Sequence, residues 1–339
     1  MTETLMQRRT RLMGPNVPTF YRMPVHIVQG DGVWLWDAEG KRYLDCYNNV
    51  PHVGHCHPKV VHAIAHQAAI LNTHTRYLHD LVLDYIERLT AKLDHGISQM
   101  IMTCTGSEAN DIALRMAQAV TGATGVIATD NTYHGNTAAV SQLSTRRPPI
   151  GGRAPWVRLV PAPDRLISPG SPCGDAALRF AANVAEAIAE LKAAGHGFSA
   201  IMLCPVFANE GMPDVPPGFL DPTVAVVRAA GGMIIADEVQ PGFGRTGSHF
   251  WGHDRMGFAP DIVTMGGTSV DNPGVRVRLD LTNLGLRAYV RAHLRVAVTT
   301  PAGRVLSGHQ DIVVSETYSG PIREARRRHE RALESIVAE

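Results

Sequence analysis

A chain of 339 residues with 45% hydrophobic and 19% charged residues has the ordinary composition of a globular protein, long enough for one large domain or two. Its formal net charge of +1 favours neither nucleic acid nor an anionic membrane as the main partner. The sequence contains no run of about 18 apolar residues and no apolar signal region near its start. We therefore expect a soluble, cytoplasmic protein.

Residues 25–49 predict a meander of short strands around two turns that contain glycine. The segments 57–71 and 78–93 have apolar residues at helical spacing and predict two amphipathic helices. Residues 99–104 predict a short buried strand, which leads directly into a helix closed by Gly122.

Strands and helices alternate in the next 140 residues or so. A strand over 125–129 precedes a region rich in Pro, Gly and Ser, 146–175, which we expect to be a long surface excursion. Beyond it the sequence predicts, in order, a helix, a strand, a helix and two strands, over 180–195, 199–207, 220–232, 233–237 and 261–267. This alternation predicts an α/β fold with a mainly parallel central sheet and helices on both faces.

Ligands bind beyond the carboxyl ends of the strands in sheets of this kind, so the segments that follow the strands are the candidate site. In TCTGSEAND, 103–111, a strand runs into Gly106, Ser107 and a helix. Backbone amides at a helix N-terminus bind phosphate, and the glycine permits close approach. Alternatively, Ser107 is simply the N-cap of the helix.

Two further segments follow predicted strands. In DNTYHGNT, 130–137, Tyr133 and His134 either stack on a flat ligand or have a structural role. In MIIADEVQPGFGRTG, 233–247, four apolar residues precede Asp237 at the strand end. A buried carboxylate needs a partner, and both a protonated heterocyclic nitrogen and Arg245 are candidates.

Taken together and in this order, TGSEAND, YHG and ADEVQPGFGRTG resemble the class III aminotransferases, fold-type-I enzymes that use pyridoxal 5′-phosphate. The resemblance extends from about Val25 to about Met265. PHVGHCHP at 51–58 and NEGMPDVPPGFL at 209–220 are most similar to the branch of ethanolamine-phosphate and phosphohydroxylysine phospho-lyases.

The resemblance implies a cofactor site made of six residues: Gly106, Ser107, Tyr133, His134, Asp237 and Gln240. The first two would hold the cofactor phosphate, and the tyrosine would stack on the pyridine ring with the histidine beside it. Asp237 would pair with the pyridinium nitrogen and keep the ring an electron sink, and Gln240 would reach the phenolic oxygen. No metal site is expected.

The family's lysine is missing from the last of these motifs. PDIVTMGGT, 260–268, is similar to a family motif in which the Schiff-base lysine stands where this chain has Gly267. Glycine supplies neither a nucleophile nor a general base, so we predict no catalytic residue and absent or impaired turnover. The four lysines of the chain all lie upstream, in the predicted meander or in or beside predicted surface helices: Lys41, Lys59, Lys92 and Lys192.

The resemblance also implies the domain organisation. An N-terminal segment and small-domain meander would occupy 1–49, and the large cofactor-binding domain would occupy 50–267. Residues 268–339 diverge from the family pattern and would form an altered or incomplete C-terminal small domain. A homodimer is expected, because family active sites form between two subunits.

Four interpretations of the function are compatible with these patterns. By family the chain is a transaminase acting on a small amine or amino acid and a keto acid, with turnover absent or impaired because of Gly267. A second is a working enzyme whose lysine loop aligns differently. A third is a phospho-lyase acting on a phosphorylated amine, and the fourth is a non-catalytic homologue that binds the cofactor or regulates a partner.

Overall fold

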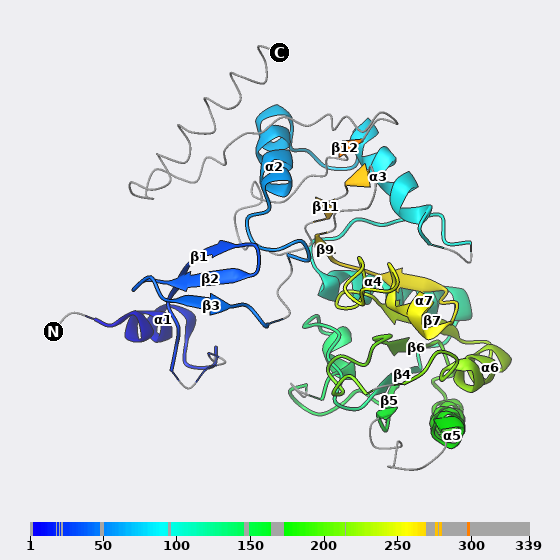
Figure 1. Ribbon diagram of the computed structural model, residues 1–339. Helices are drawn as coiled ribbons and strands as arrows, with labels where there is room; N and C mark the ends of the chain where they lie inside the picture. Colours follow the sequence, from blue (N-terminus) through cyan, green and yellow to red (C-terminus); the bar gives the residue numbers. More distant parts are fainter. Residues whose placement is uncertain are drawn as a thin grey trace. The chain divides into compact units, whose positions relative to one another are not determined.

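The computed structural model describes most of the chain up to Thr268 and a few residues beyond it (Figure 1). The described residues are 3–17, 19, 21, 23–47, 51–93, 96–145, 149–163, 173–213, 215–268, 275–276, 278–279 and 297–298. The chain divides into two compact units, of which the first comprises residues 1–48 and 53–57. The second comprises residues 49–52 and 58–339.

The first unit contains a helix and a three-stranded antiparallel sheet, which confirms the predicted meander. Its elements are α1 (Leu5–Met13), β1 (Ile27–Asp31), β2 (Trp34–Asp37) and β3 (Arg42–Leu44). At the turn between β2 and β3, Asp37 accepts hydrogen bonds from the amide of Lys41 at 2.8 Å and the hydroxyl of Tyr43 at 2.7 Å. A single acidic side chain thus holds the hairpin closed.

The second unit is built on a five-stranded sheet in the order β5-β4-β6-β7-β8, and every pair in it is parallel. The strands are β4 (Val126–Thr129), β5 (Val157–Val160), β6 (Ala200–Leu203), β7 (Met233–Asp237) and β8 (Ile262–Thr264). Because all five run the same way, their carboxyl ends meet at one edge of the sheet. The predicted mainly parallel sheet is confirmed.

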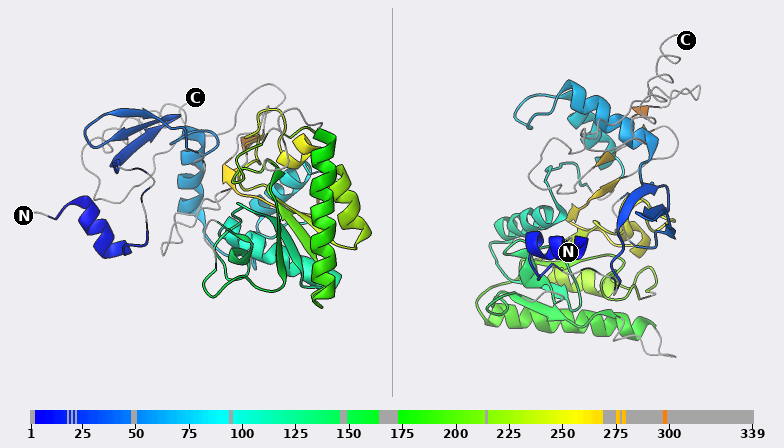
Figure 2. Two further views of the ribbon diagram at one scale, coloured as in Figure 1. Left: turned by 90° about the horizontal axis from the view of Figure 1, so that it is seen from below. Right: turned by 90° about the vertical axis from the view of Figure 1, so that its left-hand side faces the viewer.

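Helices cover both faces of this sheet. The helical elements of the unit are α2 (Pro58–Ile70), α3 (Asp80–Thr90), α4 (Gly106–Thr121), η1 (Val140–Leu143), α5 (Cys173–Ala193), α6 (Asp221–Ala229) and α7 (Gly252–Met256). α5 and α6 pack on one face, whereas α4 and η1 pack on the other. The left view of Figure 2 shows α5, in green, running along the sheet with α6 beside it.

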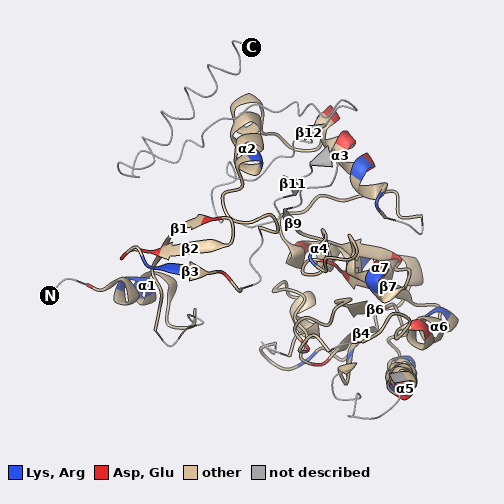
Figure 3. Ribbon diagram, viewed as in Figure 1, with Lys and Arg blue, Asp and Glu red and all other residues tan. Residues whose placement is uncertain are grey.

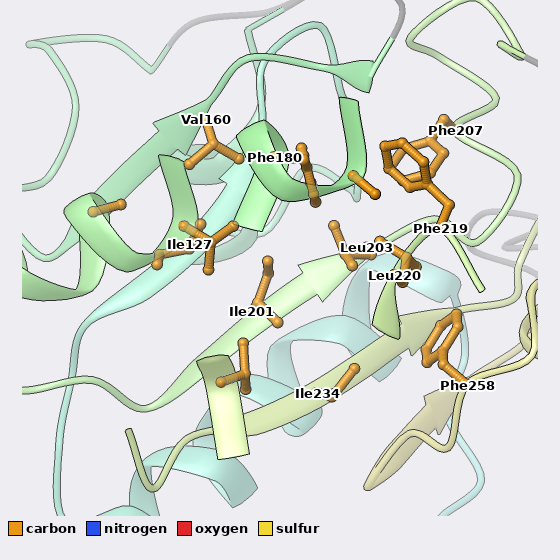
Figure 4. Packing of buried hydrophobic residues seen from close by; sticks show 14 of the residues in the cluster. Ile127, Val160, Phe180, Ile201, Leu203, Phe207, Phe219, Leu220, Ile234 and Phe258 are labelled. Atoms are coloured by element: carbon orange, nitrogen blue, oxygen red, sulfur yellow. The ribbon is translucent and has the colours of Figure 1, made fainter. Parts of the chain in front are cut away.

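The two-residue period of the strands separates two hydrophobic cores. Ile127, Ile201 and Ile234 face α5 and α6, while their neighbours in the strands face α4 and η1. In the first core the rings of Phe180, Phe207 and Phe219 meet at one end, as Figure 4 shows. These aromatic contacts hold α5 and the segment that precedes α6 against the sheet.

A third cluster lies around Trp251, which is fully buried and donates its indole N–H to the Lys92 carbonyl oxygen at 2.7 Å. The buried side chains of α3, Tyr85 and Leu89, belong to this cluster. The rest of α3 includes three acidic residues and, in its last turn, one basic residue, and Figure 3 shows red and blue segments on this helix. One apolar stripe and one charged face are what its helical periodicity predicts.

Two sequence-based expectations differ from the structure. Residues 99–104 do not form a strand, and Ile101 is 58% exposed, because a short apolar run by itself does not decide between strand and irregular backbone. The excursion predicted over 146–175 contains β5, an edge strand that pairs with β4. Beyond β8 there are two short antiparallel pairs: β9 (Gly267–Thr268) with β11 (Arg278–Leu279), and β10 (Val275–Arg276) with β12 (Ala297–Val298).

The substitution Phe180→Ala should lower the free energy of unfolding by about 3–5 kcal/mol, because it leaves a cavity among well-packed aromatic rings. The Phe180 ring is fully buried, with centroids 6.2 Å from Phe207 and 5.9 Å from Phe219. Urea denaturation followed by circular dichroism measures the change. Leu178→Ala, on the same helix but 61% exposed, is the matched control and should change stability little. Equal midpoints for the two variants would contradict this account of the core.

Candidate functional site

The centre of the candidate site is the carboxylate of Asp237, the last residue of β7. Its side chain is only 8% exposed. Oδ2 accepts hydrogen bonds from Nδ1 of His134 at 2.7 Å and from Nδ2 of Asn110 at 2.9 Å, and Oδ1 accepts one from the Val239 amide at 3.1 Å. Three donors therefore compensate the burial of this carboxylate.

Arg245, the alternative partner considered for Asp237, contacts a different side chain. Its Nε donates to Nε2 of His52 at 3.2 Å, in the loop that precedes α2. Asp237 is instead satisfied by neutral donors and by an imidazole from two other elements. The hydrogen-bond partners of this carboxylate are therefore an imidazole and neutral N–H groups rather than a guanidinium.

His134 reaches Asp237 from the loop after β4, and its ring is fully buried. Because a carboxylate oxygen only accepts, Nδ1 is the donor in this pair. Nε2 lies 3.1 Å from Oγ1 of Thr132, so both ring nitrogens have partners. The pair fixes the loop that carries Tyr-His-Gly to the end of β7.

Ser107 and Gly106 form the first turn of α4, but Ser107 is not its N-cap. The N-cap is Thr105, which has extended backbone angles and accepts the Glu108 amide at 3.1 Å through its hydroxyl. Ser107 Oγ accepts instead from the Asn136 amide at 3.1 Å. The serine hydroxyl therefore connects α4 to the loop after β4.

Gly135 explains how closely this loop approaches α4. Its φ is +140°, and an added Cβ would lie 2.6 Å from Oγ and 2.7 Å from Cα of Ser107. Similarly, a Cβ on Gly106 would lie 2.9 Å from Cγ2 of Val239, after β7. Two glycines thus let the backbones of three elements meet at the N-terminus of α4.

The structure therefore brings together five of the six residues predicted for the site. Tyr133 is half-buried beside His134, and its hydroxyl accepts a hydrogen bond from Nδ2 of Asn136 at 2.7 Å. Gln240, the sixth, lies half-buried in the turn that follows β7. In the described ranges, no three or more His, Cys, Asp or Glu side chains form a group that could hold a metal ion.

Asn110 is a buried part of the site that the sequence reasoning missed. It is 1% exposed, and its amide donates to Asp237 and to the His134 carbonyl oxygen at 2.7 Å. Its Oδ1 accepts from the hydroxyl of Thr264, the last residue of β8, at 2.5 Å. The available signal was its position, since Asn110 shares the buried face of α4 with Ala113, Leu114 and Ala117. A polar residue on an apolar stripe needs partners.

A second buried acid was also missed. Glu210 is 3% exposed, and its Oε1 accepts from the hydroxyl of Thr129, at the end of β4, at 2.5 Å. Nearby, the thiol of Cys204 is buried after β6. Burial, reinforced by the charges of Asp237 and Glu210, raises the pKa of this thiol well above its usual value. Cys204 therefore stays neutral and is not a reactive thiolate.

Glu238 has a structural role although it is adjacent to Asp237. Its carboxylate accepts the amides of Gly252 at 2.8 Å and His253 at 2.7 Å, and Nδ1 of His253 at 2.8 Å. It is fully buried and holds the start of α7. Neighbouring residues of an extended chain point to opposite sides, so only Asp237 belongs to the site.

None of the four lysines comes from the strand ends that form the site. Lys41 belongs to the first unit, Lys59 lies in α2, and Lys192 lies near the end of α5, which leads to the amino end of β6. Lys92 follows α3, with its ammonium 5.0 Å from the centre of the Phe250 ring. Gly267 begins β9 shortly after Thr264.

Among the described residues, no helix is both long and apolar enough to span a membrane.

Residues 17–270 match the sequence model of the family described as aminotransferase class-III. The chain is 39% identical over 270 residues to the alanine–glyoxylate aminotransferase 2-like protein of Drosophila melanogaster, covering 77% of this chain and 54% of the relative. It is 32% identical over 280 residues to ethanolamine-phosphate phospho-lyase homolog 1 of Caenorhabditis elegans, covering 78% and 60%.

Solved structures of a phospholyase and of an aminotransferase are also similar to this chain. A phospholyase from Arthrobacter in complex with phosphoethanolamine has 45% sequence identity and a TM-score of 0.74, covering 78% of this chain and 62% of that one. Taurine:2-oxoglutarate aminotransferase from Bifidobacterium kashiwanohense, in complex with PLP and glutamate, has 26% identity and a TM-score of 0.68, covering 80% and 63%.

These relatives confirm the predicted fold-type-I architecture. The chain spans between about half and two thirds of the length of the relatives named above. The family match nevertheless covers most of this chain and all five strands of its large sheet. The chain belongs to the class III aminotransferase family.

Proposed function

We propose that this chain binds pyridoxal 5′-phosphate at the carboxyl ends of β4, β7 and β8. The observation that carries the proposal is the buried carboxylate of Asp237, held by His134 and Asn110 next to the N-terminus of α4. This arrangement offers a negative charge and a phosphate-binding helix end in one place. By family, the activity would be amino transfer between a small amine or amino acid and a keto acid.

The N-terminus of α4 suits the phosphate group. The amides of Gly106 and Ser107 have no acceptor within the helix, because the first N–H groups of any helix lack one. Gly106 and Gly135 have no room for side chains, which keeps the backbone here within reach of a ligand. The Ser107 hydroxyl would add a further donor.

The other predicted residues suit the pyridine ring. Asp237 would accept the ring N–H, Tyr133 would stack on the ring with His134 beside it, and Gln240 would reach the phenolic oxygen. When bound, pyridoxal phosphate supplies an electron sink for a substrate carbanion. The role of the chain's own residues is to bind and orient this group and to place a fixed negative charge at Asp237.

The covalent part of the family's chemistry does not fit this chain. At Gly267 there is no amine to bind the cofactor and no base to move the substrate proton. We therefore propose reversible binding without a covalent link, with amino transfer absent or impaired. The same residues would serve a non-catalytic homologue that binds the cofactor or regulates a partner, because neither role needs an amine at residue 267.

A phospho-lyase reaction on a phosphorylated amine is the second candidate. It is supported by the 45% identity to the Arthrobacter phospholyase, which was solved in complex with phosphoethanolamine. The predicted homodimer, the cytoplasmic location and the division of the chain at residues 49 and 267 also stay proposals.

The first prediction for this site concerns cofactor attachment. The purified chain should bind pyridoxal phosphate reversibly, and borohydride should fix none of it to the protein, since Gly267 has no amine. In the variant Gly267→Lys borohydride should fix the cofactor at residue 267. Mass spectrometry of tryptic peptides measures both results. A borohydride-stable adduct of the unmodified chain, mapped to one of its four lysines, would show that the covalent site has been misassigned.

The second prediction concerns the close approach at Gly135. The substitution Gly135→Ala should abolish measurable binding of pyridoxal phosphate, because the new methyl group forces the loop away from Ser107. Isothermal titration calorimetry measures the affinity. Gly174→Ala, in the first turn of α5 with open space around it, is the matched control and should bind like the parent. Unchanged affinity in Gly135→Ala would place the phosphate elsewhere.

The third prediction separates the two activities. Amino transfer by the unmodified chain should be slower by at least about 10² than by Gly267→Lys, because a general base alone contributes about 10² to 10⁴. Keto-acid-dependent amino transfer and phosphate release from phosphoethanolamine are measured side by side on both proteins. Release of phosphate without amino transfer by Gly267→Lys would replace the transaminase proposal with the phospho-lyase one. Equal rates for the two proteins would contradict the role given to residue 267.

A further inference from the structure

A continuous chain of buried hydrogen bonds crosses the site from β8 to the loop after β4. The hydroxyl of Thr264 donates to Asn110, which donates to Asp237, and Asp237 accepts from His134. His134 is in turn 3.1 Å from the Thr132 hydroxyl. Each of these residues is at most 6% exposed, so water does not compete for the contacts.

The orientation of the Asn110 amide is determined by its partners. Asp237 and the His134 carbonyl oxygen only accept, so both contact the NH₂ group, and Oδ1 must face the Thr264 hydroxyl. With this orientation both N–H groups and the carbonyl oxygen have partners. The amide is therefore locked between elements that are 127 and 154 residues away in the sequence.

The two oxygens of Asp237 are used unequally. Oδ2 accepts two hydrogen bonds, from His134 and Asn110, and this fills its two lone pairs. Oδ1 accepts one, from the Val239 amide, and keeps a lone pair. The side chain cannot exchange its oxygens without breaking two buried contacts, so the oxygen with remaining capacity is always Oδ1.

We propose that Asn110 and Thr264 are positioning residues, which hold Oδ2 of Asp237 so that Oδ1 receives the ring N–H of the cofactor. The proposal rests on the proposed binding of pyridoxal phosphate for its ligand, but the hold on Asp237 exists in the protein alone. Because Asn110 contacts both Thr264 and Asp237, its amide fixes the end of β8 relative to the carboxylate at the end of β7.

The test removes one hydroxyl and keeps the shape. In Thr264→Val, Oδ1 of Asn110 loses its donor, so the amide and Asp237 become free to turn. Pyridoxal phosphate should bind about tenfold more weakly, measured by calorimetry. In the cofactor-free protein, the Nδ1 proton of His134, followed by NMR, should exchange with water about tenfold faster because its acceptor is less firmly held.

Two matched variants separate positioning from general loss of stability. Thr264→Ser keeps the donor and should restore both values. Thr223→Val removes a hydroxyl that is equally buried, on α6, and that has no hydrogen-bond partner. It should change neither measurement.

Each outcome decides a different statement. An unchanged proton exchange rate in Thr264→Val would overturn the positioning role, whether or not the cofactor binds. Faster exchange with unchanged affinity would overturn the assignment of Oδ1 to the cofactor. If the parent protein shows no binding of pyridoxal phosphate while its proton exchange responds as expected, the proposed function fails and the hold on Asp237 remains.

Discussion

The structure of this site depends on one buried carboxylate, that of Asp237, whose hydrogen-bond partners must be supplied by other parts of the chain. Asp237 ends the second strand from the edge of the sheet, where the strands on either side exclude most water. Leaving such a charge unpaired would cost several kcal/mol, so donors must be brought to it from other elements. The N-terminal part of α4 supplies Asn110 and the loop after β4 supplies His134 as donors to this carboxylate. The positions of both elements follow from these contacts.

The same requirement explains the glycines around the site. For Asn110 to reach Asp237, the first turn of α4 must lie against the turn after β7, and at Gly106 only a hydrogen fits beside Val239. For His134 to reach it, the next residue, Gly135, must pass directly over Ser107. The proposed phosphate site therefore lies where close approach of the elements already requires two residues without side chains.

Much of this arrangement could be predicted from the sequence, because it depends on local patterns. Apolar patterns located helices α2 to α6 and the strands of the large sheet other than β5, and the rule for parallel sheets placed His134 and Asp237 at the same edge. Ser107 also lies at this edge, although the strand expected before it does not form. The contacts of Asn110 and Thr264 could not be predicted, because they join residues more than 100 positions apart. The prolines and glycines around β5 conceal its strand pattern, and the apolar run at 99–104 predicts a strand that the structure does not contain.

The opposite directions of Asp237 and Glu238 have a consequence for how this family can accept changes in chain length. Adding or deleting one residue within β7 would turn Glu238 toward the site and leave the start of α7 without its acceptor. A single insertion would therefore disrupt both the proposed ligand contact of Asp237 and the anchoring of α7 by Glu238. In the loops that follow the strands, side chains do not alternate in direction from one residue to the next. Variation in length among relatives should therefore be confined to these loops.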